Sequence, residues 1–421
     1  MGYKTIFPKI LRTDIHYHVA RRTALDTFIS IEKTRELTLK NCNADIALIV
    51  DLDGGVMTNW VQDPERGYTR LKNNAKGRII PVLSESKPAQ GIVSFKPNEI
   101  ARLKSARYNG LKMHWQAAFN GGKNAKYGLI NDKYFEPFFK ELERNNMPLV
   151  CLHLEAPWGK MIEQRAALCD VLATYPNLNI IHAHFGAQRW RSLDEHAKIF
   201  DDFPNYYRDI STTAQHLTVV YSYKEARDFF IKYNDRLLYG TDNICSHRAD
   251  IIPNPNVRAK KYELQFEWLE TDNNVRTRGI GMVNENTPEF IKGLNLPERA
   301  LRNIYFNNTV RLLPWAKTSL LELNYPSSIF DNTPTPTPTP TPPLAPPLPP
   351  ITSINISNST IQKPKTSTSS NTTSLDQNKM ETFIDTISKI NQNDIKNINQ
   401  EQKATIINQL FRIIRLLINT K

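Results

Sequence analysis

The chain has 421 residues, a formal net charge of +12 and four cysteines, which are Cys42, Cys151, Cys169 and Cys245. Basic residues are mixed with acidic ones and form no dense stripe interleaved with aromatics, which argues against a nucleic-acid-binding protein. The cysteines lie far apart, so neither a disulfide framework nor a cysteine zinc cluster is predicted. No segment reaches the roughly 20 apolar residues of a membrane span, and we expect a cytoplasmic protein.

Short β-rich runs alternate with longer helical runs over the first 240 residues. The predicted strands are residues 10–19, 44–51, 78–83, 110–114, 148–153, 179–184, 206–211 and 236–239. Helical stretches such as residues 132–145 and 158–173 separate them. Repeated strand–helix units of this number predict an α/β protein with a closed (β/α)8 barrel rather than an open sheet.

The composition changes at Asn332, where a Thr-Pro alternation begins and continues as a proline-rich stretch to Pro350. We predict a barrel domain over residues 1–325, a disordered linker rich in Pro, Thr and Ser over residues 326–375, and an amphipathic helical tail over residues 376–421. Arg412 and Arg415 interrupt the last apolar run of the tail. Their charges favour docking on a protein partner, or on the chain itself, over membrane insertion.

Polar side chains concentrate at the predicted carboxyl ends of the strands, where barrel active sites form. They are Asp14, His16 and His18 on the first strand, Lys112 and His114 on the fourth, His153 on the fifth, His182 and His184 on the sixth, and Thr241 and Asp242 after the eighth. Six of the nine histidines fall on these strands. Residues two apart in a strand share a face, so three pairs are each predicted to point to one side. The pairs are His16 with His18, Lys112 with His114, and His182 with His184.

Clustered imidazoles and a carboxylate suit a divalent cation, above all Zn²⁺, with Mn²⁺, Fe²⁺ or Co²⁺ as alternatives. Such a cation lowers the pKa of a bound water or polarises a carbonyl. His184 or Asp242 would then transfer the proton. A single strand histidine is more often structural than a ligand, so the prediction depends on the order of these residues around the barrel.

Five segments resemble the motifs of the amidohydrolase superfamily, in the branch of aminocarboxymuconate-semialdehyde decarboxylase and related decarboxylases, hydratases and lactonases. They are TDIHYH at residues 13–18, GLKMH at 110–114, PLVCLH at 148–153, IIHAHFG at 180–186 and LLYGTD at 237–242. The resemblance spans residues 8–315 and leaves out the tail. It implies metal ligation by His16, His18, His153 and Asp242. It also implies that His184 transfers protons or orients water, and that Asp242 acts both as ligand and as base.

The sequence departs from this family pattern in two places. His182 stands where an apolar residue is usual, and no proline follows closely after Asp242. Lys112 has two interpretations: it is carbamylated and bridges two metals, as in dinuclear relatives, or it is a plain buried lysine or ion-pair partner, which we favour. Loop residues expected to rim the barrel mouth are Glu155, Trp158, Arg189, Trp190, His247 and Arg248.

The sequence therefore predicts a metal-dependent hydrolase acting on a small carboxylate or carbonyl compound. Non-oxidative decarboxylation is the alternative chemistry, because both reactions use the same metal and histidine. An alternative from another class is a degenerate barrel that serves as a scaffold, with a protein partner bound by the proline-rich segment and the tail. A homo-oligomer is compatible with either.

Overall fold

The computed structural model describes residues 2–19, 25–52, 63, 65–66, 69, 73, 77–85, 95–115, 128–154, 161–186, 192–212, 217–245, 254–278 and 287–331. The chain divides into two units, residues 1–343 and 344–421, and every described residue lies in the first. The predicted helical tail and all of the predicted linker beyond residue 331 lie outside the described residues.

The described strands are short and nearly all parallel. They are β1 (Arg12–Val19), β2 (Ile46–Asp51), β3 (Ile79–Pro81), β4 (Leu83–Glu85), β5 (Leu111–Trp115), β6 (Leu149–Leu154), β7 (Ile180–His182), β8 (Tyr206–Asp209), β9 (Leu237–Leu238) and β10 (Asn243–Cys245). Two further strands, β11 (Asn274–Arg276) and β12 (Phe290–Lys292), pair with each other in an antiparallel hairpin.

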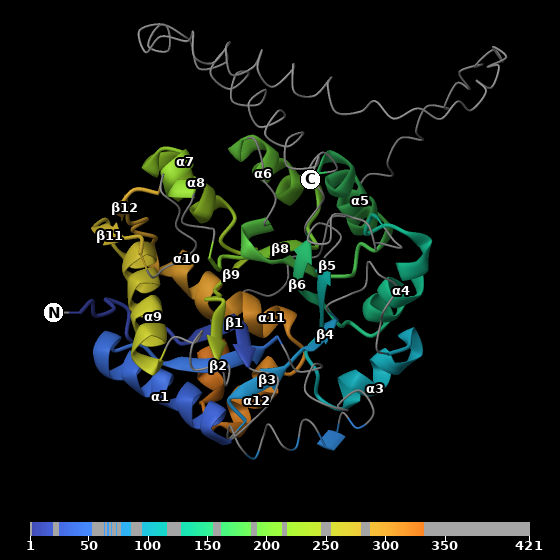
Figure 1. Ribbon diagram of the computed structural model, residues 1–421, viewed down its shortest axis with the longest axis horizontal. Coiled ribbons are helices and arrows are strands. Elements are labelled where there is room, and N and C mark those ends of the chain that lie inside the picture. The colour runs from blue at the N-terminus through green and yellow to red at the C-terminus, as the bar shows by residue number, and fades with distance from the viewer. Residues whose placement is uncertain are drawn as a thin grey trace, which may run out of the picture. The chain divides into compact units, whose positions relative to one another are not determined.

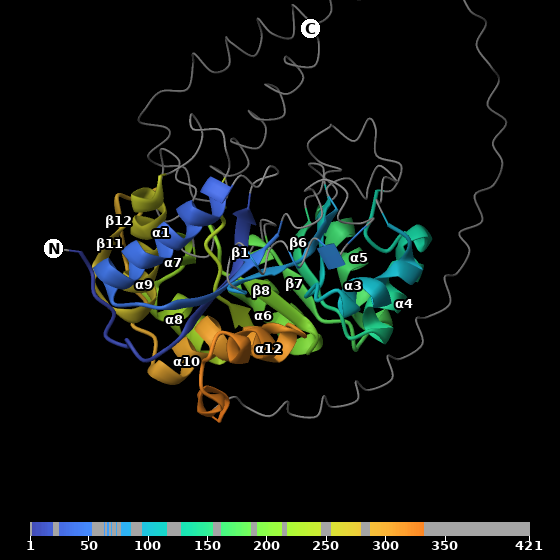
Figure 2. The same cartoon turned by 90° about the horizontal axis from the view of Figure 1, so that it is seen from below.

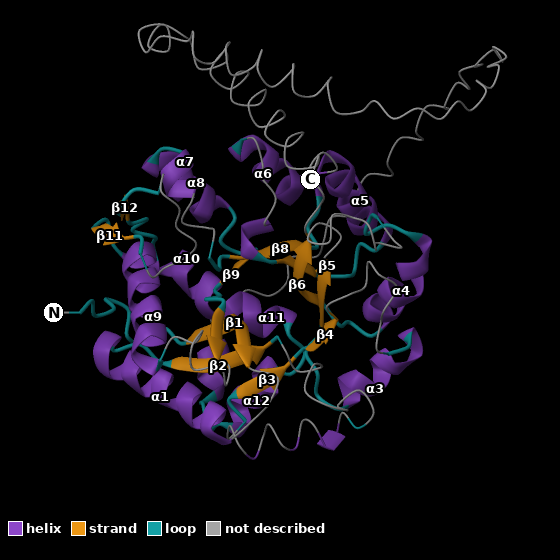
Figure 3. Ribbon diagram, in the orientation of Figure 1, coloured by secondary structure: helices purple, strands orange, loops and turns teal. Residues whose placement is uncertain are grey.

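The parallel strands close into a barrel. One sheet has the order β10-β1-β2-β3 and the other runs from β4 to β9 in sequence. Only Val82 separates β3 from β4, and only residues 239–242 separate β9 from β10, so each pair is a single crossing of the wall. The N–H of Ile15 donates to the carbonyl of Tyr239 (3.0 Å), which connects the first strand to the last. The predicted (β/α)8 barrel is confirmed, and Figure 3 shows the strands gathered in the centre with helices around them.

Helices follow the strands in order around the barrel (Figure 1). They are α1 (Leu25–Cys42), α3 (Ile100–Ser105), α4 (Glu136–Arg144), α5 (Met161–Thr174), α6 (Leu193–Asp202), α7 (Leu217–Val220), α8 (Tyr223–Lys232), α9 (Pro255–Glu270), α10 (Glu298–Arg302), α11 (Asn308–Leu312) and α12 (Ala316–Glu322). Short 3₁₀ turns are η2 (Pro97–Glu99), η3 (Lys133–Phe135), η4 (His184–Gly186) and η7 (Ser327–Phe330), and η6 (Asn303–Asn307) is a π-helical turn. The predicted helix at residues 132–145 corresponds to η3 and α4, and the one at 158–173 to α5.

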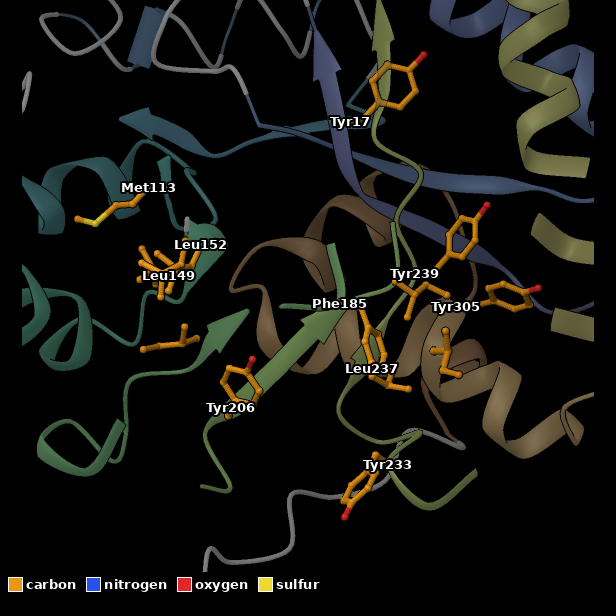
Figure 4. Packing of buried hydrophobic residues seen from close by; sticks show 14 of the residues in the cluster. Tyr17, Met113, Leu149, Leu152, Phe185, Tyr206, Tyr233, Leu237, Tyr239 and Tyr305 are labelled. Atoms are coloured by element: carbon orange, nitrogen blue, oxygen red, sulfur yellow. The ribbon is translucent and has the colours of Figure 1, made fainter. Parts of the chain in front are cut away.

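Alternation along the strands separates two apolar layers. Leu111 and Met113 of β5 belong to the outer cluster between strands and helices, which leaves Lys112 and His114 on the inner face. Leu149 and Leu152 of β6 belong to the same outer cluster and lie close together in Figure 4. The inner cluster is formed mainly by small and branched side chains from β1, β2, β3, β6, β7 and β9. Buried apolar side chains on both faces explain why these strands read as continuous hydrophobic runs.

The last helices cover the end of the barrel at which the strands begin. Leu312, Leu313 and Leu320 pack into the inner cluster, and Figure 2 shows α12 below the strands. The Tyr325 hydroxyl donates to Oδ2 of Asp45, which immediately precedes β2 (2.6 Å). Packing continues beyond the predicted boundary at residue 325, because η7 also lies against the inner cluster. The opposite end of the barrel carries the polar residues considered next.

Candidate metal centre

Three side chains from the first and last strands bring metal-ligand atoms together. Nε2 of His16 lies 3.4 Å from Oδ1 of Asp242, and Nε2 of His18 lies 3.3 Å from the same oxygen. One ligand atom from each residue lies within 4.8 Å of the other two. The side chain of His16 is 1% exposed, whereas those of His18 and Asp242 are 20% and 22% exposed. Both histidines point to the same side, and the cluster is open to solvent on the side of His18 and Asp242.

A bulge in β1 that Asp14 stabilises gives the first strand this geometry. The pairing of β1 with β2 shifts in register between Asp14 and Tyr17. Oδ1 of Asp14 accepts the backbone N–H groups of His16 (3.1 Å) and Thr241 (3.0 Å). Its Oδ2 accepts the hydroxyls of Thr241 (2.5 Å) and Tyr262 (2.6 Å). Both oxygens are thus engaged, so Asp14 joins the first strand to the last and to α9 rather than contributing to the ligand cluster.

A buried carboxylate at the end of β8 orients His16. Nδ1 of His16 donates to Oδ2 of Asp209, the last residue of β8 (2.9 Å). The hydroxyl of Ser211 lies 3.1 Å from this nitrogen, and the sulfur of Cys151 lies 3.6 Å from it. A carboxylate at Nδ1 favours the tautomer that carries its proton there. Nε2 then directs its lone pair toward the ligand cluster, as in carboxylate–histidine–metal sites.

The strand β7, predicted over residues 179–184, ends earlier than expected, and its early end separates His182 from His184. β7 ends at His182, and His184 and Phe185 adopt positive φ angles of 52° and 55° in the turn η4. Nδ1 of His182 lies 2.8 Å from the hydroxyl of Tyr206, which belongs to the outer cluster. The expectation that His182 and His184 point to the same side is wrong, because alternation does not continue beyond the end of the strand. His182 is a buried structural histidine.

The turn η4 brings His184 beside the ligand cluster. Its ring centroid lies 4.6 Å from that of His16. Its backbone N–H donates to Oδ1 of Asp209 (3.1 Å), which fixes the turn to β8. The hydroxyls of Ser211 and Thr212 lie 2.9 Å and 2.8 Å from its Nδ1. Asp209 therefore holds both His16 and the turn that carries His184.

The strands β5 and β6 place three more polar side chains next to the cluster. The ring of His153 lies 4.7 Å from that of His184 and 4.2 Å from that of His114. Nζ of Lys112 lies 3.5 Å from Nε2 of His18. His153 thus adjoins the cluster, but neither of its nitrogens belongs to the set of described ligand atoms within 4.8 Å of one another.

The charges of the site favour a cation at His16 and a neutral ring at His184. Burial alone lowers the pKa of His16, yet Cys151, Asp209 and Asp242 together raise it well above its ordinary value. Burial, and then the neighbouring His16, lower the pKa of His184 to about 3. His184 is therefore uncharged near neutral pH.

The donor set fits a divalent cation of borderline softness. Two imidazoles and a carboxylate are ligands that zinc sites combine, and the carboxylate at Nδ1 of His16 is the usual support for such a ligand. The same negative charges that hold a proton on His16 would hold a metal ion in its place. His16, His18 and Asp242 would bind it directly, with His153 as the adjoining imidazole.

Four residues in contact with the predicted site were not identified from the sequence, namely Cys151, Asp209, Ser211 and Thr212. Asp209 is an acidic residue at the carboxyl end of a predicted strand, so the rule that identified the other polar residues also applies to it. Cys151 reaches the inner face through a shift in the pairing of β6 with β7 and has a φ of 57°. The predicted rim residues Glu155, Trp158, Arg189, Trp190, His247 and Arg248 lie outside the described residues.

The chain matches the family described as Amidohydrolase over residues 97–315, which is just over half of the 421 residues. The chain belongs to the amidohydrolase family. This agrees with the resemblance in its strand-end motifs, and members of the family are enzymes. No curated protein matches the chain. Among the described helices, none combines the length and the apolar character needed to cross a bilayer.

Several solved structures are similar to this chain at low sequence identity. An uncharacterised TIM-barrel protein from Bordetella bronchiseptica is 13% identical, with 75% of this chain and 100% of that chain covered and a TM-score of 0.42. An amidohydrolase from Burkholderia multivorans with bound zinc is 13% identical, with coverages of 72% and 100% and a TM-score of 0.40. A manganese-bound 5-carboxyvanillate decarboxylase from Novosphingobium aromaticivorans is also 13% identical, with coverages of 61% and 96% and a TM-score of 0.36.

Proposed function

We propose that this chain is a metal-dependent hydrolase that acts on a small carboxylate or carbonyl compound. The convergence of His16, His18 and Asp242 on one point at the barrel mouth carries this proposal. His16, His18, His153 and Asp242 are the proposed ligands of a divalent cation, most simply Zn²⁺. The membership of the amidohydrolase family supports the same reaction class.

A bound Zn²⁺ would polarise a substrate carbonyl and lower the pKa of water in the site. The chain's own groups prepare the proton transfers. His184 is neutral and its ring lies 4.7 Å from that of His153, and we propose it, from its place beside the ligand cluster, as the residue that transfers a proton at the mouth. Asp242 stays ionised because, although burial opposes this, His16 and His18 hold its pKa well below the ordinary value. An ionised Asp242 is able to act as ligand and as base.

The first experiment measures metal content and turnover together. Protein purified with Zn²⁺ should retain about one ion per chain or more, because structured histidine–carboxylate sites bind zinc tightly. His16→Ala and Asp242→Ala should lose the metal and the hydrolysis of a panel of lactones and amides. Asp228→Ala, an exposed substitution on α8, is the control. A metal-free wild-type barrel, with stability unchanged by added zinc, would contradict the proposal and favour the scaffold alternative.

Decarboxylation is distinguished in the same assay. Aromatic acids are added to the panel, and release of CO2 is followed beside hydrolysis. Metal-dependent CO2 release without hydrolysis would replace the hydrolase by a carboxy-lyase built on the same ligand set.

A further inference from the structure

Lys112 is a buried cation at the mouth of the barrel with no anionic partner in the described part of the chain. Its side chain lies on the inner face of β5, and the residue is only 5% exposed. Nζ of Lys112 contacts Nε2 of His18 at 3.5 Å, and no described carboxylate forms an ion pair with it.

A buried ammonium group without a counter-ion destabilises a protein, because it loses hydration and gains no compensating charge. A chain that used this position only for packing would be served better by Leu or Met. The long side chain of Lys112 instead delivers its charge next to His18, whose own side chain is 20% exposed. Among the described residues no carboxylate meets this ammonium group, so its position suits an anion that enters the site from solvent.

The charge balance of the proposed metal centre points the same way. Asp209 and Asp242 supply two negative charges around His16, which balance one divalent cation. Within the described part of the chain, no third carboxylate balances the positive charge of Lys112. Because the ammonium group and the proposed cation both border His18, a single negatively charged group between them would be attracted by both.

We propose that Lys112 binds the carboxylate of an anionic substrate, so that the carboxylate lies between its ammonium group and the His16–His18–Asp242 cluster. This inference rests on the proposed metal-dependent function and narrows its substrate class to carboxylates. Lys112 is then a substrate-binding residue that discriminates against neutral amides and esters. An ammonium–carboxylate pair shielded from water adds more affinity than the same pair on the surface.

The test compares three small probes on the zinc-loaded protein by isothermal titration calorimetry. Benzoate carries the carboxylate, benzamide is its neutral counterpart, and acetohydroxamate, which binds zinc through its two oxygens, reports on the metal without a carboxylate. The wild type should bind benzoate more tightly than benzamide. Lys112→Met should weaken benzoate binding by about 10- to 100-fold, the value of a charge-assisted hydrogen bond, and leave acetohydroxamate unchanged. Lys112→Arg should retain more affinity than Lys112→Met, and Lys140→Met, on the exposed face of α4, should match the wild type.

Each contrary result has a distinct meaning. Unchanged benzoate affinity in Lys112→Met, with acetohydroxamate still bound, overturns the role of Lys112 and leaves the metal centre intact. Two zinc ions per chain in the wild type and one in Lys112→Met, again with unchanged benzoate affinity, would show that the amine serves metal binding as a carbamate. If the wild type retains no zinc and does not bind acetohydroxamate, the metal centre is refuted and this inference with it.

Discussion

Asp209 acts on the site through two histidines. One of its oxygens accepts Nδ1–H of His16, and the other accepts the backbone N–H of His184 and both the N–H and the hydroxyl of Ser211. Despite its burial, the charge of His16 and these hydrogen bonds keep the pKa of Asp209 below the ordinary value, so it remains ionised. A single carboxylate therefore sets the tautomer of a proposed ligand and the position of a proposed proton carrier.

Asp209→Asn tests this positioning role. The asparagine oxygen can satisfy the turn, but its amide nitrogen then faces Nδ1 of His16 and requires the tautomer with the proton on Nε2. Zinc affinity should fall by about 10- to 100-fold, as for other supporting residues of metal sites. Competition with a fluorescent zinc chelator measures it, with Asp228→Asn as the exposed control. Equal zinc affinity in Asp209→Asn and wild type would show that the His16 tautomer does not depend on this carboxylate.

At the residue scale, the sequence predicts groups that follow a simple positional rule. His16, His18 and Asp242 lie together because they end strands that become neighbours when the barrel closes. Cys151 escapes the rule because it reaches the inner face only through an irregular strand. His153 is correctly placed at the mouth, and its membership of the ligand set stays a prediction.

The first strand shows how an element is adjusted to serve the site. In a regular strand, Asp14 and His16 would share a face. The bulge instead lets Asp14 hold the N–H of His16 and the backbone and hydroxyl of Thr241. The three polar residues of this motif therefore have two roles. Asp14 connects the first strand to Thr241, whereas His16 and His18 belong to the ligand cluster.

Asp14→Ala should be strongly destabilising, because it leaves four buried donors from His16, Thr241 and Tyr262 without an acceptor. Several unsatisfied donors together imply a loss of about 3 to 5 kcal/mol in the free energy of unfolding. Tyr262→Phe removes one of these donors and should cost only about 1 kcal/mol. Urea unfolding of both variants measures the difference. If Asp14→Ala loses no more stability than Tyr262→Phe, the other hydrogen bonds accepted by Asp14 do not contribute to stability.

The strand lengths are less predictable than the strand positions. All eight predicted runs correspond to crossings of the barrel wall, since buried parallel strands leave a strong apolar signal. The breaks at Val82 and at residues 239–242 have no such signal, because they depend on how the ring closes. The early end of β7, which redirects His184, is set by the positive φ angles of the following turn.

The barrel is closed at one end by residues on both sides of the predicted domain boundary at residue 325. Phe330 stacks on Phe306 with ring centroids 6.1 Å apart. Tyr325 joins the segments before β2 and β3 by hydrogen bonds to Asp45 (2.6 Å) and from Arg78 (3.3 Å). The compositional change at Asn332 is real, but the packed segment continues nearly to it.

A chain that ends at Asp331 should be more stable than one that ends at Asn324. The longer chain retains the Tyr325 hydrogen bonds and the burial of Ile329 and Phe330, worth about 2 to 4 kcal/mol together. Tyr325→Phe in the longer chain isolates the hydroxyl and should cost about 1 kcal/mol. Chemical unfolding of the three proteins decides the matter. Equal stability of the two truncated chains would place the C-terminal boundary of the folded barrel before residue 325.

The residues with left-handed backbone conformation divide into two groups by their place in the fold. Among the described non-glycine residues with positive φ, Asn43, Arg107, Asn146 and Asn324 lie just after helices, and Asn295 lies between β12 and α10; asparagine tolerates this backbone conformation well. The others, Cys151, His184, Phe185, Thr212 and Asp242, gather at the mouth of the barrel. For cysteine, phenylalanine and threonine this backbone conformation is unfavourable, at a cost of about 1 kcal/mol or more each. Glycine or asparagine would occupy the left-handed backbone at Thr212 with less strain, but either would remove the hydroxyl beside Nδ1 of His184.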